Sequence, residues 1–163
     1  MRDFVAGIIA VALLLFALSL ATTLHFFRRR RIRARDAERA LGRAVIAEIP
    51  ADDDLVLFSE DHDAFHYGQR TIPKLTIAAA RVLINGNPIA AVVSRRHAET
   101  AALHPTSFED HPEGIARDRW DVAIESTDGA IMIECGAIRE RVSQELARAI
   151  FDALRRAIEQ EAR

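Results

Sequence analysis

The chain contains a single cysteine among its 163 residues, and this scarcity removes several kinds of site. Cys135 has no second thiol for an internal disulfide, and no CxxC pair is present to hold zinc or an iron–sulfur cluster. Cys135 follows Ile133 at an inward position of an expected strand. We therefore interpret it as a small buried apolar residue rather than a reactive thiolate, and we predict no cofactor and no bound metal.

Catalytic motifs are missing as well. The sequence has no GxSxG nucleophile elbow, no GxxxxGK[ST] phosphate-binding loop, no GxGxxG dinucleotide fingerprint and no HExxH metal-binding helix. We therefore expect a protein that is not an enzyme.

Lysine is nearly absent, and the charge is distributed unevenly. Of the 22 basic residues 21 are arginine, a bias typical of GC-rich bacterial genomes, and Lys74 is the exception. Residues 28–48 carry eight arginines and three acidic residues, a net charge of +5, whereas residues 49–163 carry 13 basic and 20 acidic residues, a net charge of −7. Clustered basic residues supply affinity for nucleic acid, so the acidic C-terminal part argues against such a partner.

A long apolar run is present at the N-terminus. Residues 4–27 (FVAGIIAVALLLFALSLATTLHFF) form 24 positions without a charge. As a helix they would extend about 36 Å at ~1.5 Å per residue, enough to cross a hydrocarbon core of ~30 Å. We therefore predict a transmembrane helix over residues 1–27.

Six arginines follow this run within eight residues: Arg28, Arg29, Arg30, Arg31, Arg33 and Arg35. Positive charge beside an apolar helix stays on the cytoplasmic side, which predicts a single-pass protein of the bacterial inner membrane with its N-terminus outside and its C-terminal domain in the cytoplasm. We expect the arginines to contact lipid headgroups, because basic residues beside a span are attracted to anionic lipid. The alternative is a cleaved export signal, since Ser19-Leu20-Ala21 resembles a small-x-small cleavage pattern.

Residues 28–49 contain no proline and have apolar residues close to helical spacing, which predicts a basic helical stalk continuing from the membrane. Pro50 is the expected stop, because proline disfavours helical geometry in the residue before it. Residues 50–163 then form the expected cytoplasmic domain.

Three hairpins are predicted in this domain. The first joins residues 55–58 (LVLF) and 64–67 (AFHY), and the second joins residues 74–84 and 89–94 across an Asn-Gly-Asn-Pro turn that needs positive backbone angles. The third reverses at Asp128-Gly129, with apolar residues at alternate positions on both sides. Its predicted inward residues are Trp120, Val122, Ile124, Ile131, Ile133 and Cys135.

From residue 137 onward the apolar period changes to that of an amphipathic helix. Its predicted packed stripe is Val142, Leu146, Ile150, Leu154 and Ile158, widened by Ala147, Phe151, Ala153 and Ala157. A helix of this kind needs a sheet to cover.

Residues 95–119 form an unusually long polar connection, and loops of this length are functional or disordered. We expect a short helix over residues 96–103 and a partner-binding surface. Its candidate residues are Arg95, Arg96, His97, His104, Phe108 and His111. The alternative is a metal-dependent active site that uses the loop histidines. His62 and His66, four residues apart, would share a face only on a helix, and a solvated turn is favoured for them.

The order of hairpins closed by one C-terminal helix, with KLTIAAARVLINGNPIAAVVS and WDVAIESTDGAIMIECG as its central segments, resembles the bacterial pleckstrin-homology-like (PH-like) domains over residues 50–160. The resemblance implies an α+β fold, in which an antiparallel sheet or partial barrel is closed by the helix, and binding of proteins, peptides or lipids without catalysis. The long loop and the acidic surface depart from the family and favour a protein partner over a lipid headgroup.

These observations predict a membrane-anchored interaction or structural module, serving as an accessory subunit or assembly factor of an inner-membrane protein complex. Two alternatives remain: a membrane-tethered metal-dependent enzyme, and a sensor of anionic lipid.

Overall fold

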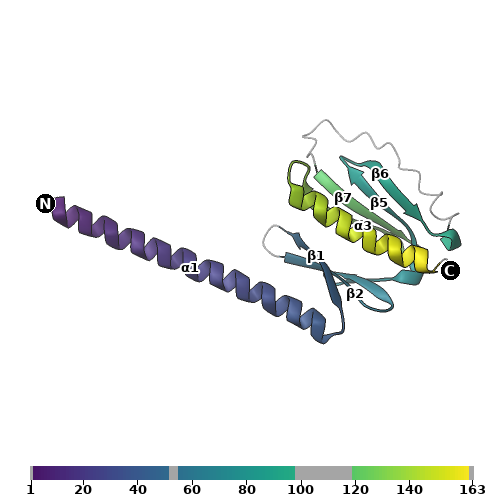
Figure 1. Ribbon diagram of the computed structural model, residues 1–163, viewed down its shortest axis with the longest axis horizontal. Coiled ribbons are helices and arrows are strands. Elements are labelled where there is room, and N and C mark those ends of the chain that lie inside the picture. The colour runs from purple at the N-terminus through teal and green to yellow at the C-terminus, as the bar shows by residue number, and fades with distance from the viewer. Residues whose placement is uncertain (1, 52–54, 98–118, 162–163) are drawn as a thin grey trace. The chain divides into compact units, whose positions relative to one another are not determined.

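The computed structural model describes residues 2–51, 55–97 and 119–161 and divides into two compact units, Met1–Leu41 and Gly42–Arg163 (Figure 1). The first unit consists of one helix. The second contains eight strands and a C-terminal helix among its described residues, which makes the chain an α+β protein, as the sequence predicted.

The N-terminal helix α1 runs without interruption from Arg2 to Ala40, through the apolar run and the arginines that follow. The predicted stalk was too long, because the helix ends nine residues before Ile49. Gly42 has φ +75°, a left-handed conformation that glycine adopts readily and that commonly ends a helix. The helical part beyond residue 27 is therefore about 20 Å long at ~1.5 Å per residue.

Residues 44–50, predicted to be the end of the stalk, form strand β1 instead (Ala44–Pro50). Ala47 and Ile49, two residues apart, are both buried, which is the alternate burial expected of a strand. The apolar residues at 44 and 45 also fit helical spacing, and pairing with the next strand decides between the two.

Four strands in chain order make the first antiparallel sheet: β1, β2 (Leu55–Glu60), β3 (Ala64–Tyr67) and β4 (Arg70–Pro73). The predicted hairpin of β2 and β3 is confirmed, with Phe58 opposite Tyr67. The rings of Phe58 and Phe65 stack at 5.4 Å between centroids and are fully buried, which places the core on this face of the sheet.

The second antiparallel sheet has the order β6-β5-β7-β8. Its strands are β5 (Ile77–Ile84), β6 (Asn87–Val93), β7 (Arg119–Ser126) and β8 (Gly129–Ala137). Both predicted hairpins are confirmed, and the turn between β5 and β6 has positive φ at Asn85 and Gly86, as expected. Strand β7 returns to pair with β5 rather than β6, so β6 lies at an edge.

Two short 3₁₀ turns accompany this sheet. Residues 74–76, predicted as the start of a strand, form the turn η1 (Lys74–Thr76). The turn η2 (Arg95–His97) follows β6, and residues 98–103 of the predicted short helix lie outside the described residues.

Helix α3 (Arg141–Glu161) packs on strands of both sheets and closes one core. Ile150, Leu154 and Ile158 are buried as predicted, and so are Val122, Ile124, Ile133 and Cys135 of the third hairpin. Trp120, Ile131, Leu146 and Phe151 are half-buried against the core. Val142 was wrongly assigned to the packed stripe: it is 63% exposed, and the adjacent Ser143 is buried in its place at the first turn.

Candidate functional site

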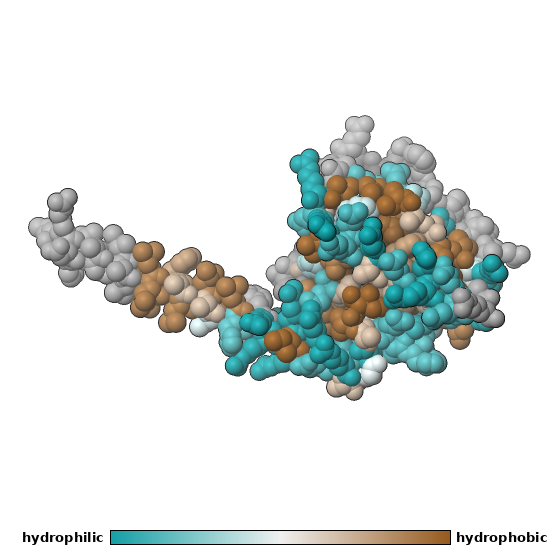
Figure 2. Space-filling model, in the orientation of Figure 1, coloured by the Kyte–Doolittle hydropathy of each residue, from teal (hydrophilic) through white to brown (hydrophobic). Residues whose placement is uncertain are grey.

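Helix α1 has the length and composition to cross a membrane. Its large apolar side chains between residues 13 and 26 are 52–69% exposed, on every side of the helix. Figure 2 shows them as a brown band that gives way to hydrophilic residues. Exposed apolar surface of this extent is typical of a helix that crosses a bilayer.

The hydroxyls of Thr22 and Thr23 are satisfied within this helix. Thr22 donates its hydroxyl to the carbonyl oxygens of Leu18 (3.0 Å) and Ser19 (2.8 Å), and Thr23 donates to Ser19 (2.9 Å). Such bonds to the preceding turn remove the cost of placing an unpaired hydroxyl in hydrocarbon.

The arginines after the apolar run form a ring rather than a stripe. All six are exposed: Arg28, Arg29, Arg30, Arg31, Arg33 and Arg35. At 3.6 residues per turn, four consecutive arginines cover more than one full turn, and the set spans only about 10 Å along the axis. A ring of this kind matches a planar layer of headgroups around the helix, whereas a one-sided partner would need a stripe.

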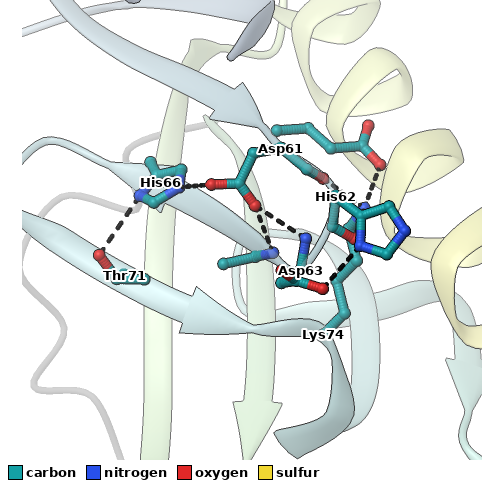
Figure 3. A network of polar contacts seen from close by, with 8 residues as sticks. Asp61, His62, Asp63, His66, Thr71 and Lys74 are labelled. Atoms are coloured by element: carbon teal, nitrogen blue, oxygen red, sulfur yellow. Dashed lines mark hydrogen bonds and ion pairs between the residues drawn. The ribbon is translucent and has the colours of Figure 1, made fainter. Parts of the chain in front are cut away.

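A cluster of polar contacts occupies the β2–β3 turn and neighbouring strands (Figure 3). The Oδ1 atom of Asp61 accepts hydrogen bonds from the backbone amides of Asp63 (2.9 Å) and Ala64 (2.7 Å). The Oδ2 atom of Asp61 accepts a bond from Nε2 of His66 at 2.7 Å. The bond from His66 is the main reason that the pKa of Asp61 is lowered to about 2, and the two amide bonds add to it.

His66 connects the turn to β4. Because the Asp61 carboxylate only accepts, Nε2 of His66 carries the proton, and Nδ1 is free to accept from the Thr71 hydroxyl at 3.3 Å. His66 is 7% exposed, so the interpretation as a solvated turn residue was wrong for it. The chain Thr71–His66–Asp61 resembles a nucleophile–base–acid relay in its connectivity. In the described structure these bonds fasten β3 to β4 and to the turn.

His62 does not join His66. It is exposed and contacts Asp63 at 2.7 Å, so these two histidines do not converge on one point. Among the described residues no group of three or more His, Cys, Asp or Glu side chains is arranged to hold a metal ion.

Lys74, the one lysine, closes the same cluster. Its Nζ atom donates to Glu60 Oε1 (2.8 Å) and to the carbonyl oxygens of Asp61 (2.7 Å) and His62 (3.2 Å). It also lies 5.3 Å from the centroid of the Phe65 ring. These four contacts satisfy the charge of Lys74 within the domain. No such role for Lys74 was predicted from the sequence. The available signal in the sequence was the nearby polar segment Asp61-His62-Asp63.

A cleft with a volume of about 180 Å³ lies between β4 and the β7–β8 turn. Arg70, Thr71 and Asp128 provide its polar walls. Ligand pockets usually enclose about 300–1,000 Å³. This cleft is therefore too small for a typical cofactor.

The second sheet buries one thiol, Cys135, and the acid Asp121. Cys135 is 1% exposed, and burial raises the pKa of its thiol to about 12, which keeps it protonated. Burial also raises the pKa of Asp121, whose Oδ2 accepts from Nε of Arg119 at 3.0 Å. Arg119 bridges Asp121 to Glu134 on β8, so this cluster ties two strands together.

The predicted partner-binding loop is described only at its ends. Arg95 and Arg96 are exposed in η2, and His97 ends that turn. His104, Phe108 and His111 lie outside the described residues.

Comparison of this chain with family models, curated proteins and solved structures finds no match. The fold and the described sites define an α+β protein with an N-terminal helix able to span a membrane.

Proposed function

We propose that this chain is a single-pass protein of the bacterial inner membrane whose C-terminal domain is a non-enzymatic interaction module. In this proposal it serves as an accessory subunit or assembly factor of a membrane protein complex. The N-terminus lies outside, and the domain lies in the cytoplasm.

The observation that carries the proposal is the boundary on α1 between exposed apolar side chains and the arginine ring. Lipid covers the first, and the headgroups of the cytoplasmic leaflet contact the second. The net charge of −7 on residues 49–163 supports a role away from the anionic surface.

The domain supports binding better than catalysis. Its described polar clusters are paired internally, its thiol is buried, and its cleft is small. PH-like domains bind partners with a bent sheet closed by a helix, and two sheets packed against α3 support this comparison. We propose the surface of residues 95–119 as the partner-binding element.

Affinity purification tests the proposal. The protein carries a C-terminal tag, is extracted from native membranes in mild detergent, and is compared with a tagged variant in which residues 98–118 are replaced by a Gly/Ser linker of equal length. We expect a stoichiometric partner with the first and none with the second, at an unchanged melting temperature. Purification of the intact chain without a partner would contradict the subunit proposal.

Metal analysis tests the enzyme alternative. The purified protein is measured for zinc and iron beside a variant with His97, His104 and His111 changed to alanine. Stoichiometric metal lost in the variant would favour the enzyme, and we expect less than a tenth of an equivalent in both.

Limited proteolysis in reconstituted bilayers tests the lipid-sensor alternative. The full chain is reconstituted, and its C-terminal domain is probed by limited proteolysis in anionic and neutral bilayers. We expect the same cleavage pattern in both, because the acidic domain has no attraction to anionic lipid. Protection in anionic bilayers alone would favour the sensor.

A further inference from the structure

Strand β6 differs from the other three strands that lie at sheet edges. Each of the others carries a charged residue, Glu48 in β1, Arg70 in β4 and Glu134 in β8, whereas residues 87–93 (NPIAAVV) carry none. Proteins usually protect edge strands with charge, proline or a bulge, because an open edge pairs with other strands. β6 has a proline and a bulge, but only in its first half.

The protected half ends at Ile89. Pro88 lacks an N–H group, and the register with β5 shifts between Val82 and Leu83, which leaves Ile89 as an extra residue in β6. From Ala90 to Val93 the strand pairs regularly with β5. Among the residues that the structure describes, no strand pairs with residues 90–93 on the side away from β5, so this part of the edge is open to pairing.

The direction of the free backbone groups follows from one hydrogen bond. The Ser94 amide donates to the Ala78 carbonyl at 2.8 Å, which makes these opposite residues a hydrogen-bonded pair. In an antiparallel ladder such pairs alternate, so Val92 and Ala90 also bond to β5. The N–H and C=O groups of Ala91 and Val93 then point away from β5, toward the open edge.

Side chains on the outer face of this edge are apolar. Ile89 is 55% exposed, Val93 is 44% exposed, and Ala91 between them is exposed. Arg81, opposite Ala91 on β5, is turned to Glu125 at 2.8 Å and is less than a fifth exposed, so its charge is neutralised within the sheet. The edge thus offers uncharged apolar surface beside unpaired backbone.

We propose that β6 pairs with β6 of a second copy of this chain, antiparallel and centred on Val92, to join the two sheets into one of eight strands. In this register Ala91 of each copy lies opposite Val93 of the other, and the two pairs form four backbone hydrogen bonds. A small side chain meets a larger one on the outer face. Arg95 and Arg96 fall opposite Ile89 and Pro88 of the other copy, so no arginine faces another arginine.

A second copy is favoured over a foreign strand for two reasons. The register is self-complementary, as an isologous contact requires. The membrane anchor also confines copies to one surface and raises their effective concentration, an argument that rests on the proposed function. The register argument does not depend on the anchor.

Disulfide formation between two full-length variants tests the register. Ala91→Cys and Val93→Cys both change exposed residues, and the Cα atoms of a hydrogen-bonded pair lie about 5.5 Å apart, within disulfide range. After mild oxidation in membranes, we expect the co-expressed variants to give at least about tenfold more linked dimer than either variant alone. Wild type is the background control, because Cys135 is buried. Ala91→Cys with Met132→Cys on the other edge strand is the matched control.

Co-purification of tagged and untagged copies gives a second, independent measurement. Ala91→Lys places a charge on the open edge, and we expect recovery of the untagged copy to fall by about tenfold, whereas Met132→Lys leaves it unchanged. The melting temperature of each variant reports folding, and membrane fractionation reports the anchor separately. Linked dimer no greater than in the matched control, equal linking by Ala91→Cys alone, or linking only to a different protein would overturn the proposal.

Discussion

The two long helices of this protein carry their apolar residues in opposite ways. In α1 the large apolar side chains from Leu13 to Phe26 are exposed on all sides, whereas in α3 Ile150 and Leu154 are fully buried against the sheets. Both helices contain leucine, alanine and arginine in quantity. What differs is their order, because α3 separates polar from apolar positions around its axis and α1 separates them along it.

This difference assigns each helix its surrounding. An apolar stripe requires a protein partner along one side, and the two sheets provide it. An apolar cylinder that ends in a ring of arginines has the length and composition to cross a membrane, which is the surrounding that we propose for α1. Equal substitutions in the two helices should therefore have unequal effects.

The largest expected effect on stability is in α3, whose apolar side chains lie in the core. Leu154→Ala removes a fully buried side chain and should lower the free energy of unfolding of the domain by about 2–5 kcal/mol. Leu18→Ala, at a residue that is 61% exposed in α1, should change it by less than about 0.5 kcal/mol. Chemical denaturation of the full chain in detergent measures both, and similar losses would remove the distinction between the helices.

A smaller effect is expected where α3 meets β8. Gly136 has φ +112°, and a Cβ atom placed there would lie 2.6 Å from the buried Ser143 hydroxyl oxygen. Gly136→Ala should cost about 1–3 kcal/mol through this clash and the strained backbone. Gly129→Ala, where φ is +131° and no atom lies within 4 Å, isolates the backbone contribution. Equal thermal shifts in the two variants would rule out the contact with α3 as a cause.

The arginine ring offers a test on the membrane side. Changing Arg28, Arg29 and Arg30 to glutamine removes half of the positive flank, so a mixture of orientations should replace a single one. The matched variant changes Arg148, Arg155 and Arg156 on α3 and should keep the original orientation. Protease protection of a C-terminal tag in membrane vesicles measures the fraction of molecules in each orientation. An unchanged fraction in the first variant would show that the ring does not set the orientation.

The smallest expected effect is at the β2–β3 turn. The pKa of Asp61 is about 2 in the folded protein and near 4 in an unfolded chain, so folding gains stability from the ionised form above pH 4. That gain disappears as the pH falls from 4 toward 2. Wild type should therefore exceed Asp61→Asn by about 1 kcal/mol at pH 7, a value reduced by exposure to solvent, and by nearly nothing at pH 2.

Melting curves at several pH values provide this measurement, with Asp128→Asn as an exposed control that should show no such trend. A difference between wild type and Asp61→Asn that stays constant down to pH 2 would contradict the proposed role of the Asp61–His66 bond.

Local sequence patterns predicted most elements of the domain. The turn residues Asn85-Gly86 and Asp128-Gly129 specify tight reversals by their backbone preferences, and alternation of apolar residues specifies the strands beside them. The prediction was wrong where the apolar residues fit both the helical period and the strand period, as at Ala44 and Val45. It also misplaced Val142, because the first turn of α3 directs Ser143 toward Gly136 of β8 and leaves Val142 exposed.

The polar cluster was harder to predict because its partners come from three elements. Asp61, His66 and Thr71 lie within eleven residues, but their convergence requires the pairing of β3 with β4. Spacing along the chain drew attention to His62 and His66 as a pair, whereas the fold directs them to different carboxylates.

The sequence by itself determined the apolar helix, the arginine ring, the hairpins and the amphipathic helix, because each depends on residues that are neighbours along the chain. Only the tertiary structure decided the order of strands in the second sheet, since β7 could have paired with either strand of the preceding hairpin. That choice places β5 in the interior and leaves the uncharged strand β6 at an edge. Long-range pairing depends on the burial of a common core, which no local pattern encodes.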